Sequence, residues 1–168
     1  YGNSKLLFRG PQIALDQPYI AVVGGTETYG KFVEAPFCQS LERMLNVTVA
    51  NFGCMNASID TVASDAGLMQ LCQNAVVTIV QMTGAQNLTN KHYSVHPRRN
   101  DRLVQVSDDL VAEFPGIEFR DIYFTRHLLS SLQLESSERF DRIRRDLQEN
   151  WVYRFRATLD EIGGQIVL

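Results

Sequence analysis

The stretch Tyr19–Gly30, YIAVVGGTETYG, decides the fold that we expect for this chain. Its first residues, Tyr19 to Val23, form an unbroken apolar, aromatic and β-branched run that ends at Gly24-Gly25. A short run of this kind is typical of a strand buried on both faces, as in the middle of a parallel sheet. Polar side chains follow directly, from Thr26 to Tyr29, at the strand end where open α/β sheets bind ligands. We therefore expect a functional site there.

Three other short runs also have strand character. They are Val47–Phe52, Ala75–Met82 and Gln165–Leu168. Apolar residues at helical spacing predict helices over Phe37–Leu45, Ser58–Asn74 with Ser58 as N-cap, Arg102–Phe114, and from Ser136 or Ser137 to Ile162. Leu88–Asn100 is expected to be a polar loop, and Ile117–Gln133 suits either a helix or an extended segment. The alternation predicts a three-layer α/β/α fold with a parallel, flavodoxin-like sheet.

The length of 168 residues suits one domain, with residues 1–17 as an N-terminal arm packed over it. The chain begins at Tyr1 without a methionine and ends in a strand that has barely started. We therefore expect a fragment of a longer chain, truncated at its C-terminus.

Bulk composition argues against several classes of partner. A formal charge of −3 gives no reason to expect nucleic acid or an anionic membrane, and no apolar run reaches the roughly 18 residues that cross a bilayer. Cys38, Cys54 and Cys72 are odd in number and widely spaced, which indicates free, mostly buried thiols and a cytoplasmic setting. No cluster has metal-ligand spacing, so we expect no metal and no cofactor.

Three predicted strand ends should deliver Thr26, Gly53 and Asn87 to the same edge of the sheet. A phosphate loop does not explain this edge, although Gly25–Lys31 matches GxxxxGK. Phe32 stands where the metal-binding Ser or Thr is needed, and Pro36 disrupts the helix that would receive the phosphates.

Three blocks resemble the SGNH (GDSL-type) hydrolase family, whose motifs are GDSxxxG, NxG and GxND after successive strands. Here they read Gly24–Gly30 (GGTETYG), Asn51–Gly53 (NFG) and Gly84–Asn87 (GAQN). The resemblance covers residues 19–90 and implies a nucleophilic hydroxyl at Thr26. It also implies oxyanion donors at the Gly53 N–H and the Asn87 side chain. The sequence departs from the family where Gly25 replaces Asp and Thr26 replaces Ser.

The general base is absent from these blocks, because the DxxH motif of the family follows a fifth strand. His96 on the expected loop is the candidate within this chain; otherwise the base lies beyond Leu168. His92 has no distinguishing context, and His127 suits packing on a helix. Purely structural roles stay open for Thr26, Asn51 and Asn87, as caps or loop ties.

The whole chain also resembles a bacterial family of domains of unknown function, through residues 1–11 (YGNSKLLFRGP), Gly24–Gly30, Gly84–Asn87 and His96–Asp101 (HPRRND). That resemblance implies a fold and no reaction.

Three functions remain open. The first is an esterase or acyl-transfer enzyme that acts on a small acylated, carbohydrate-type substrate. The second is a catalytically silent domain that binds an anionic small molecule, with Arg98, Arg99 and the strand-end residues Gly25, Glu27 and Asn51 as binding residues. The third is an interaction module or oligomer that uses Leu6–Phe8 and the Trp151 face.

Overall fold

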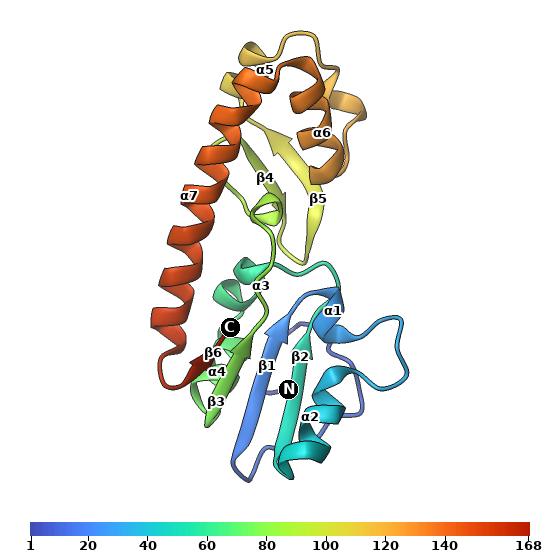
Figure 1. Cartoon of the computed structure of the whole chain (residues 1–168), viewed down its shortest axis with the longest axis vertical. Coiled ribbons are helices and arrows are strands. Elements are labelled where there is room, and N and C mark those ends of the chain that lie inside the picture. Colours follow the sequence, from blue (N-terminus) through green and yellow to red (C-terminus); the bar gives the residue numbers. More distant parts are fainter.

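Four parallel strands build one end of the protein in the computed structural model, which describes residues 1–168 (Figure 1). The strands are β1 (Tyr19–Gly24), β2 (Thr48–Gly53), β3 (Val77–Val80) and β6 (Ile166–Val167), in the order β2-β1-β3-β6. The register of β1 and β2 runs from Tyr19 opposite Thr48 to Gly24 opposite Gly53. The predicted α/β class with a parallel sheet is confirmed, and all four expected strands are present.

Helices cover the two faces of this sheet. Successive β1 side chains point to opposite faces, so Ile20 and Val22 pack with Cys38 of α2 (Phe37–Leu45). The other face packs against α3 (Ile59–Ser64), α4 (Ala66–Gln73) and the C-terminal part of α7 (Ser137–Ile162). Asn46, in the left-handed conformation, ends α2 as expected, and the Ser136 hydroxyl accepts from the Arg139 N–H to begin α7.

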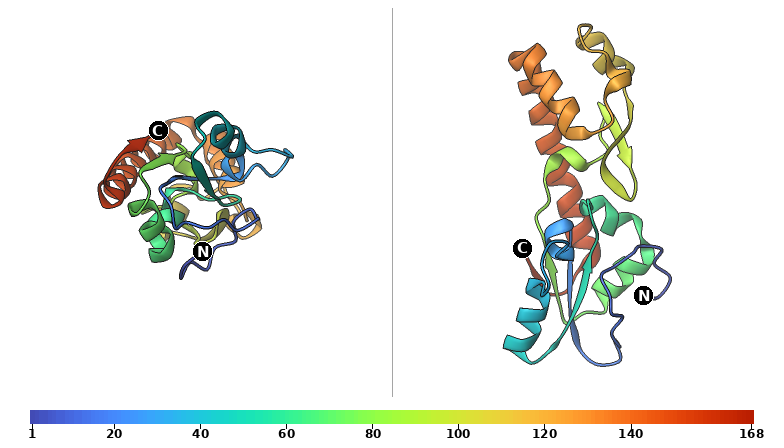
Figure 2. Two further views of the ribbon diagram at one scale, coloured as in Figure 1. Left: turned by 90° about the horizontal axis from the view of Figure 1, so that it is seen from below. Right: turned by 90° about the vertical axis from the view of Figure 1, so that its right-hand side faces the viewer.

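A hairpin and two helices form the other end of the protein. β4 (Tyr93–His96) pairs antiparallel with β5 (Arg99–Val106), and α5 (Asp108–Glu113), the short turn η2 (Phe119–Asp121) and α6 (Thr125–Glu135) follow. They enclose a second core with buried Tyr93, Val95, Leu110, Phe114, Ile122, Leu128, Leu132, Ile143 and Leu147. The long helix α7 runs beside both ends and joins them (Figures 1 and 2).

The hairpin corrects two predictions. The polar loop over Leu88–Asn100 and the helix over Arg102–Phe114 are wrong, because β4 occupies part of the first segment and β5 runs from the end of the first into the start of the second. Tyr93 and Val95 alternate with more exposed neighbours, which is the period of a strand. Only α5 remains of the expected helix, and it begins where the Ser107 hydroxyl accepts from the Leu110 N–H.

The single helix expected over Ser58–Asn74 is two helices. Asp65 separates them, because its carboxylate accepts from the Leu68 N–H at 2.8 Å and so caps α4. Ser58 occupies the predicted N-cap position, now of α3, but its hydroxyl makes no capping hydrogen bond and donates to the Asn100 side chain instead.

The N-terminal arm, residues 1–17, has neither helix nor strand and packs against the sheet end. The rings of Tyr1 and Phe8 contact Phe52 edge to face, with centroids 5.2 and 5.3 Å from its ring. At Gly67 the arm lies so close that an added Cβ would sit 2.4 Å from the Ser4 nitrogen.

Three further features bear on the expectations. Cys38, Cys54 and Cys72 are buried and free, as predicted, and burial raises the pKa of Cys54 and Cys72 to about 12. Trp151 is partly buried against the core of the sheet end, and its indole N–H donates to the Thr83 carbonyl at 2.7 Å. None of the helices combines the length and apolarity that a bilayer crossing needs.

Candidate functional site

The loop after β1 is organised by Gln81, the residue that follows β3. Its Oε1 accepts from the Gly25 N–H at 2.9 Å and from the Thr28 hydroxyl at 2.7 Å. Its Nε2 donates to the Glu27 carboxylate at 2.9 Å, and this hydrogen bond is the main cause that lowers the pKa of Glu27. Gly25 and Glu27 therefore hold the loop in place. Sequence reasoning missed Gln81, although its position directly after a buried strand marks it.

Thr26 begins the short helix α1 (Thr26–Tyr29), and its hydroxyl is both a donor to and an acceptor from the same residue. It accepts from the Asn56 N–H at 3.0 Å and donates to the Asn56 Oδ1 at 3.3 Å. Thr26 thus ties the β1 loop to the loop after β2, which is the structural role that the sequence left open.

The Gly53 N–H, which the sequence predicted as an oxyanion donor, is already engaged in a hydrogen bond within β2. That N–H donates to the Asn51 Oδ1 at 2.9 Å, and the Asn51 Nδ2 donates to the Thr28 carbonyl at 2.8 Å. Gly53 also lies under α1, where an added Cβ would be 2.3 Å from the Tyr29 nitrogen. Asn51 and Gly53 therefore pack β2 against α1, and the backbone N–H of Gly53 is not free to bind a ligand.

Asn87 does not join this loop network. It lies in the short turn η1 (Ala85–Asn87), beside β5, α6 and α7, and its Oδ1 accepts from the Thr125 hydroxyl at 2.8 Å. The expected meeting of three strand ends is therefore made by Gln81 instead of Asn87, and Asn87 ties η1 to the start of α6.

His96 lies at the hairpin turn, exposed to solvent. Its Nδ1 accepts from the Arg98 N–H at 3.1 Å, which places the proton of the neutral ring on Nε2. A general base needs an unprotonated nitrogen directed at its target and a partner that orients the ring. No carboxylate contacts this ring, so the geometry makes Nε2 a donor and does not support the predicted role of base.

The pocket that gathers most of the positive charge lies between the arm, the loop after β2 and the hairpin. It has a volume of ≈ 590 Å³, and His96 and Asn56 line it. Its cationic side chains are Lys5, Lys31, Arg98, Arg99 and Arg102. The only carboxylate in its wall is Asp101, whose buried Oδ1 has no hydrogen-bond partner. The structure thus brings His96, Arg98 and Arg99 together and places Asn56, the partner of Thr26, at the same pocket.

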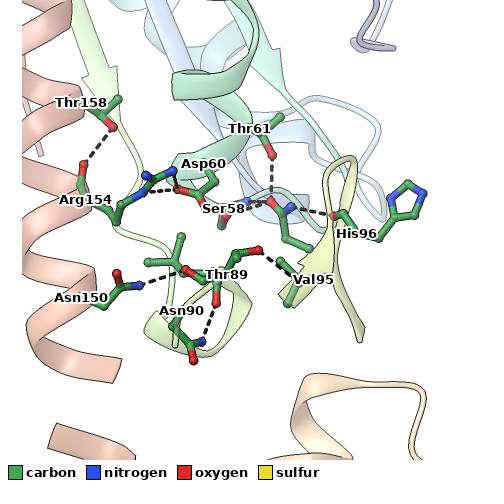
Figure 3. Close-up of polar contacts among 12 residues, drawn as sticks. Ser58, Asp60, Thr61, Thr89, Asn90, Val95, His96, Asn150, Arg154 and Thr158 are labelled. Atoms are coloured by element: carbon green, nitrogen blue, oxygen red, sulfur yellow. Dashed lines mark hydrogen bonds and ion pairs between the residues drawn. The ribbon is translucent and has the colours of Figure 1, made fainter. Parts of the chain in front are cut away.

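Asn100 holds the hairpin against the sheet end and so sets the wall of this pocket. It is 1% exposed, and its Oδ1 accepts from the Ser58 N–H at 2.7 Å and from the hydroxyls of Ser58 and Thr61, both at 2.8 Å. Its Nδ2 donates to the His96 carbonyl at 2.9 Å. Figure 3 shows this convergence of the hairpin and α3. Sequence reasoning missed Asn100, because a buried polar residue breaks the hydrophobic pattern.

The junction is joined to α7 as well. The Nε and Nη2 of Arg154 both donate to one oxygen of the Asp60 carboxylate of α3, Oδ1, at 2.8 and 2.7 Å (Figure 3). These are charge-assisted hydrogen bonds, which are stronger than bonds between neutral groups. The hairpin, α3 and α7 are therefore linked by polar contacts next to the pocket.

Two other polar sites are less suited to a ligand. A pocket of ≈ 370 Å³ between the arm and α2 contains Arg9, but its guanidinium already donates to the carbonyls of Gly30 and Glu34. Near the other end, the buried His92 lies 2.9 Å from the Asp146 carboxylate, and the hydrogen bond from Lys91 is the main cause that lowers the pKa of Asp146. No group of three or more His, Cys, Asp or Glu is arranged to hold a metal ion.

The family described as a domain of unknown function, DUF6473, matches residues 1–168. No curated protein and no solved structure matches the chain.

Proposed function

The chain belongs to the DUF6473 family, whose name states no activity, and we therefore propose a function from the site itself: a catalytically silent domain that binds a small anionic molecule. The observation that carries this proposal is the convergence of five cationic side chains and one carboxylate on one pocket. Like charges that share a pocket repel one another in the free protein. A bound anion relieves that repulsion, and arginine forks suit phosphate and carboxylate groups in particular.

The hydrogen bonds of the predicted catalytic groups support binding over turnover. The Thr26 hydroxyl is engaged by Asn56, the Gly53 N–H by Asn51, and the Nδ1 of His96 by a backbone donor. A nucleophile without an adjacent base is weak at neutral pH. By contrast, no ion pair engages Arg98, Arg99 or Arg102, so all three remain available to a ligand.

The finer fold assignment is part of this proposal. The order β2-β1-β3-β6 agrees with the first four positions of a flavodoxin-like sheet, which has the order 2-1-3-4-5. Helices on both faces of the sheet fit the same three-layer arrangement. We propose a flavodoxin-like arrangement in which the predicted site residues serve loop structure and the hairpin supplies the ligand contacts.

Replacing both hairpin arginines tests the proposal. Arg98→Ala/Arg99→Ala should weaken binding of pyrophosphate at least about tenfold, because each lost charged contact is worth roughly 1.5–3 kcal/mol. Isothermal titration calorimetry at low ionic strength measures it, with inorganic phosphate as the simpler probe, and added salt should weaken the wild type.

The matched control is Arg144→Ala/Arg145→Ala, which removes two consecutive exposed arginines from α7, away from the pocket. It changes net charge equally and should leave the affinity within about twofold. Equal weakening by both double variants would reduce the effect to general charge attraction. A wild type that binds neither phosphate nor pyrophosphate would contradict the proposal.

The acyl-transfer reading remains a second candidate, because Thr26 does lie at the turn after β1 where the hydrolase resemblance places a nucleophile. Under the binding proposal, the chain hydrolyses p-nitrophenyl acetate no faster than buffer, and Thr26→Ala changes nothing in that assay. Hydrolysis by the wild type that Thr26→Ala abolishes and Thr26→Ser retains would favour the enzyme instead.

A further inference from the structure

We propose, resting on the anion-binding function above, that the natural ligand is an amphiphilic phosphate monoester, with a phosphate head joined to a short apolar tail. The same pocket that holds the cationic side chains is also lined by apolar ones, Leu6, Leu7, Met55 and Phe124. An ion alone would leave that apolar surface in water. A ligand with both parts would bury it.

Three of these apolar side chains are unusually open to solvent. Leu7 is 88% exposed, Phe124 43% and Met55 42%. Leu7 lies on the arm between the partly buried Leu6 and Phe8, which pack on the core, so the arm itself is anchored while Leu7 projects from it. Single exposed apolar residues are ordinary, but these three line the same pocket as the cationic side chains.

Charge and apolar surface adjoin within this pocket. The guanidinium of Arg102 lies over the Phe124 ring, 5.4 Å from its centroid. A head group held by Arg102 would therefore have its tail directly against Phe124, and Met55 supplies an adaptable surface for a tail of variable shape.

A phosphate head fits better than a carboxylate, because five cations exceed what one monoanion needs, and a phosphate monoester carries up to two charges at neutral pH. A single dissolved molecule fits better than a lipid surface. The volume of ≈ 590 Å³ falls within the range of small-molecule pockets, whereas the chain as a whole carries a net charge of −3, which disfavours an anionic bilayer.

A homologous ligand series tests this inference. Calorimetric titration with inorganic, methyl, butyl and hexyl phosphate should show affinity that rises roughly threefold for each added methylene that becomes buried. The variant Leu7→Ser should flatten the dependence of affinity on chain length. Its matched control is Leu134→Ser, since Leu134 on α6 is also 88% exposed but lies outside the pocket. That control should retain the full dependence of affinity on the length of the alkyl chain.

The outcomes separate the two proposals. If inorganic and methyl phosphate bind through Arg98 and Arg99 but the longer tails add nothing, the amphiphile inference fails and anion binding stands. If no phosphate binds, both fail. Co-sedimentation with vesicles of an anionic phospholipid is the final measurement. If the protein co-sediments with the vesicles but does not bind monomeric hexyl phosphate, its ligand is a membrane surface and the inference is wrong.

Discussion

Asn100→Leu should lower the free energy of unfolding by about 3–5 kcal/mol, because it leaves three buried donors without their acceptor. The Ser58 N–H, the Ser58 hydroxyl and the Thr61 hydroxyl all donate to the Asn100 Oδ1, and leucine has a similar size but accepts nothing. The His96 carbonyl loses its donor at the same time. Urea denaturation followed by far-ultraviolet circular dichroism measures the change.

Two further variants show whether this effect comes from the hydrogen bonds of the Asn100 side chain. Asn100→Asp keeps an acceptor for the three donors, but it buries a carboxyl group and sets its second oxygen against the His96 carbonyl, so it should recover only part of the stability that Asn100→Leu loses. Asn74→Ala, at an exposed position after α4, should change stability by less than about 0.5 kcal/mol. A loss below about 1 kcal/mol for Asn100→Leu would mean that the hairpin does not depend on this residue.

The same variant should also affect ligand binding. Asn100 precedes two of the pocket residues, Asp101 and Arg102, and follows Arg98 and Arg99. Without the hydrogen bonds of Asn100, the hairpin no longer holds these side chains against the loop after β2. We therefore infer that the pocket is preorganised by a buried amide that contacts no ligand.

The sheet end could be predicted from sequence because its central strand β1 is buried on both faces. Residues 19–23 form a continuous apolar and aromatic run, residues 77–80 are all β-branched, and the glycines and polar residues that follow mark where each strand ends. The helices α2 and α7 were equally clear, since each keeps an apolar stripe and ends at a recognisable residue, Asn46 and Gly163.

The hairpin could not be predicted in the same way, because its decisive contact is polar. Arg98–Arg102 (RRNDR) contains no apolar residue, so no strand period is visible there. Asn100 is buried by its hydrogen bonds with α3, whose residues lie about 40 positions earlier in the chain. Pattern reasoning detects hydrophobic burial and does not detect a buried amide with partners so distant in sequence.

The residues of the candidate site also fall into those that the sequence could place and those that it could not. Arg98, Arg99 and His96 line one pocket, and their closeness could be foreseen because they are neighbours in sequence. The pairings of Thr26 with Asn56 and of Asn87 with Thr125 depend on tertiary structure, and each gives a predicted catalytic group a structural hydrogen bond. The three motif blocks thus indicated where the chain turns and not what each side chain does.

Gly53→Ala should destabilise the protein by about 3 kcal/mol, at the upper end of the usual overpacking range, because the added methyl group meets backbone that cannot rotate away. The Cβ would lie 2.3 Å from the Tyr29 nitrogen and 2.7 Å from the Thr28 carbonyl carbon, so α1 must move off β2. Gly84→Ala is the matched control at another strand-end loop, where the methyl group meets only the flexible Gln86 side chain, and it should cost less than about 0.5 kcal/mol. Chemical denaturation measures the free energy of unfolding of both variants. Equal stabilities would mean that α1 can move off β2 at little cost, which would contradict the close packing of α1 on Gly53.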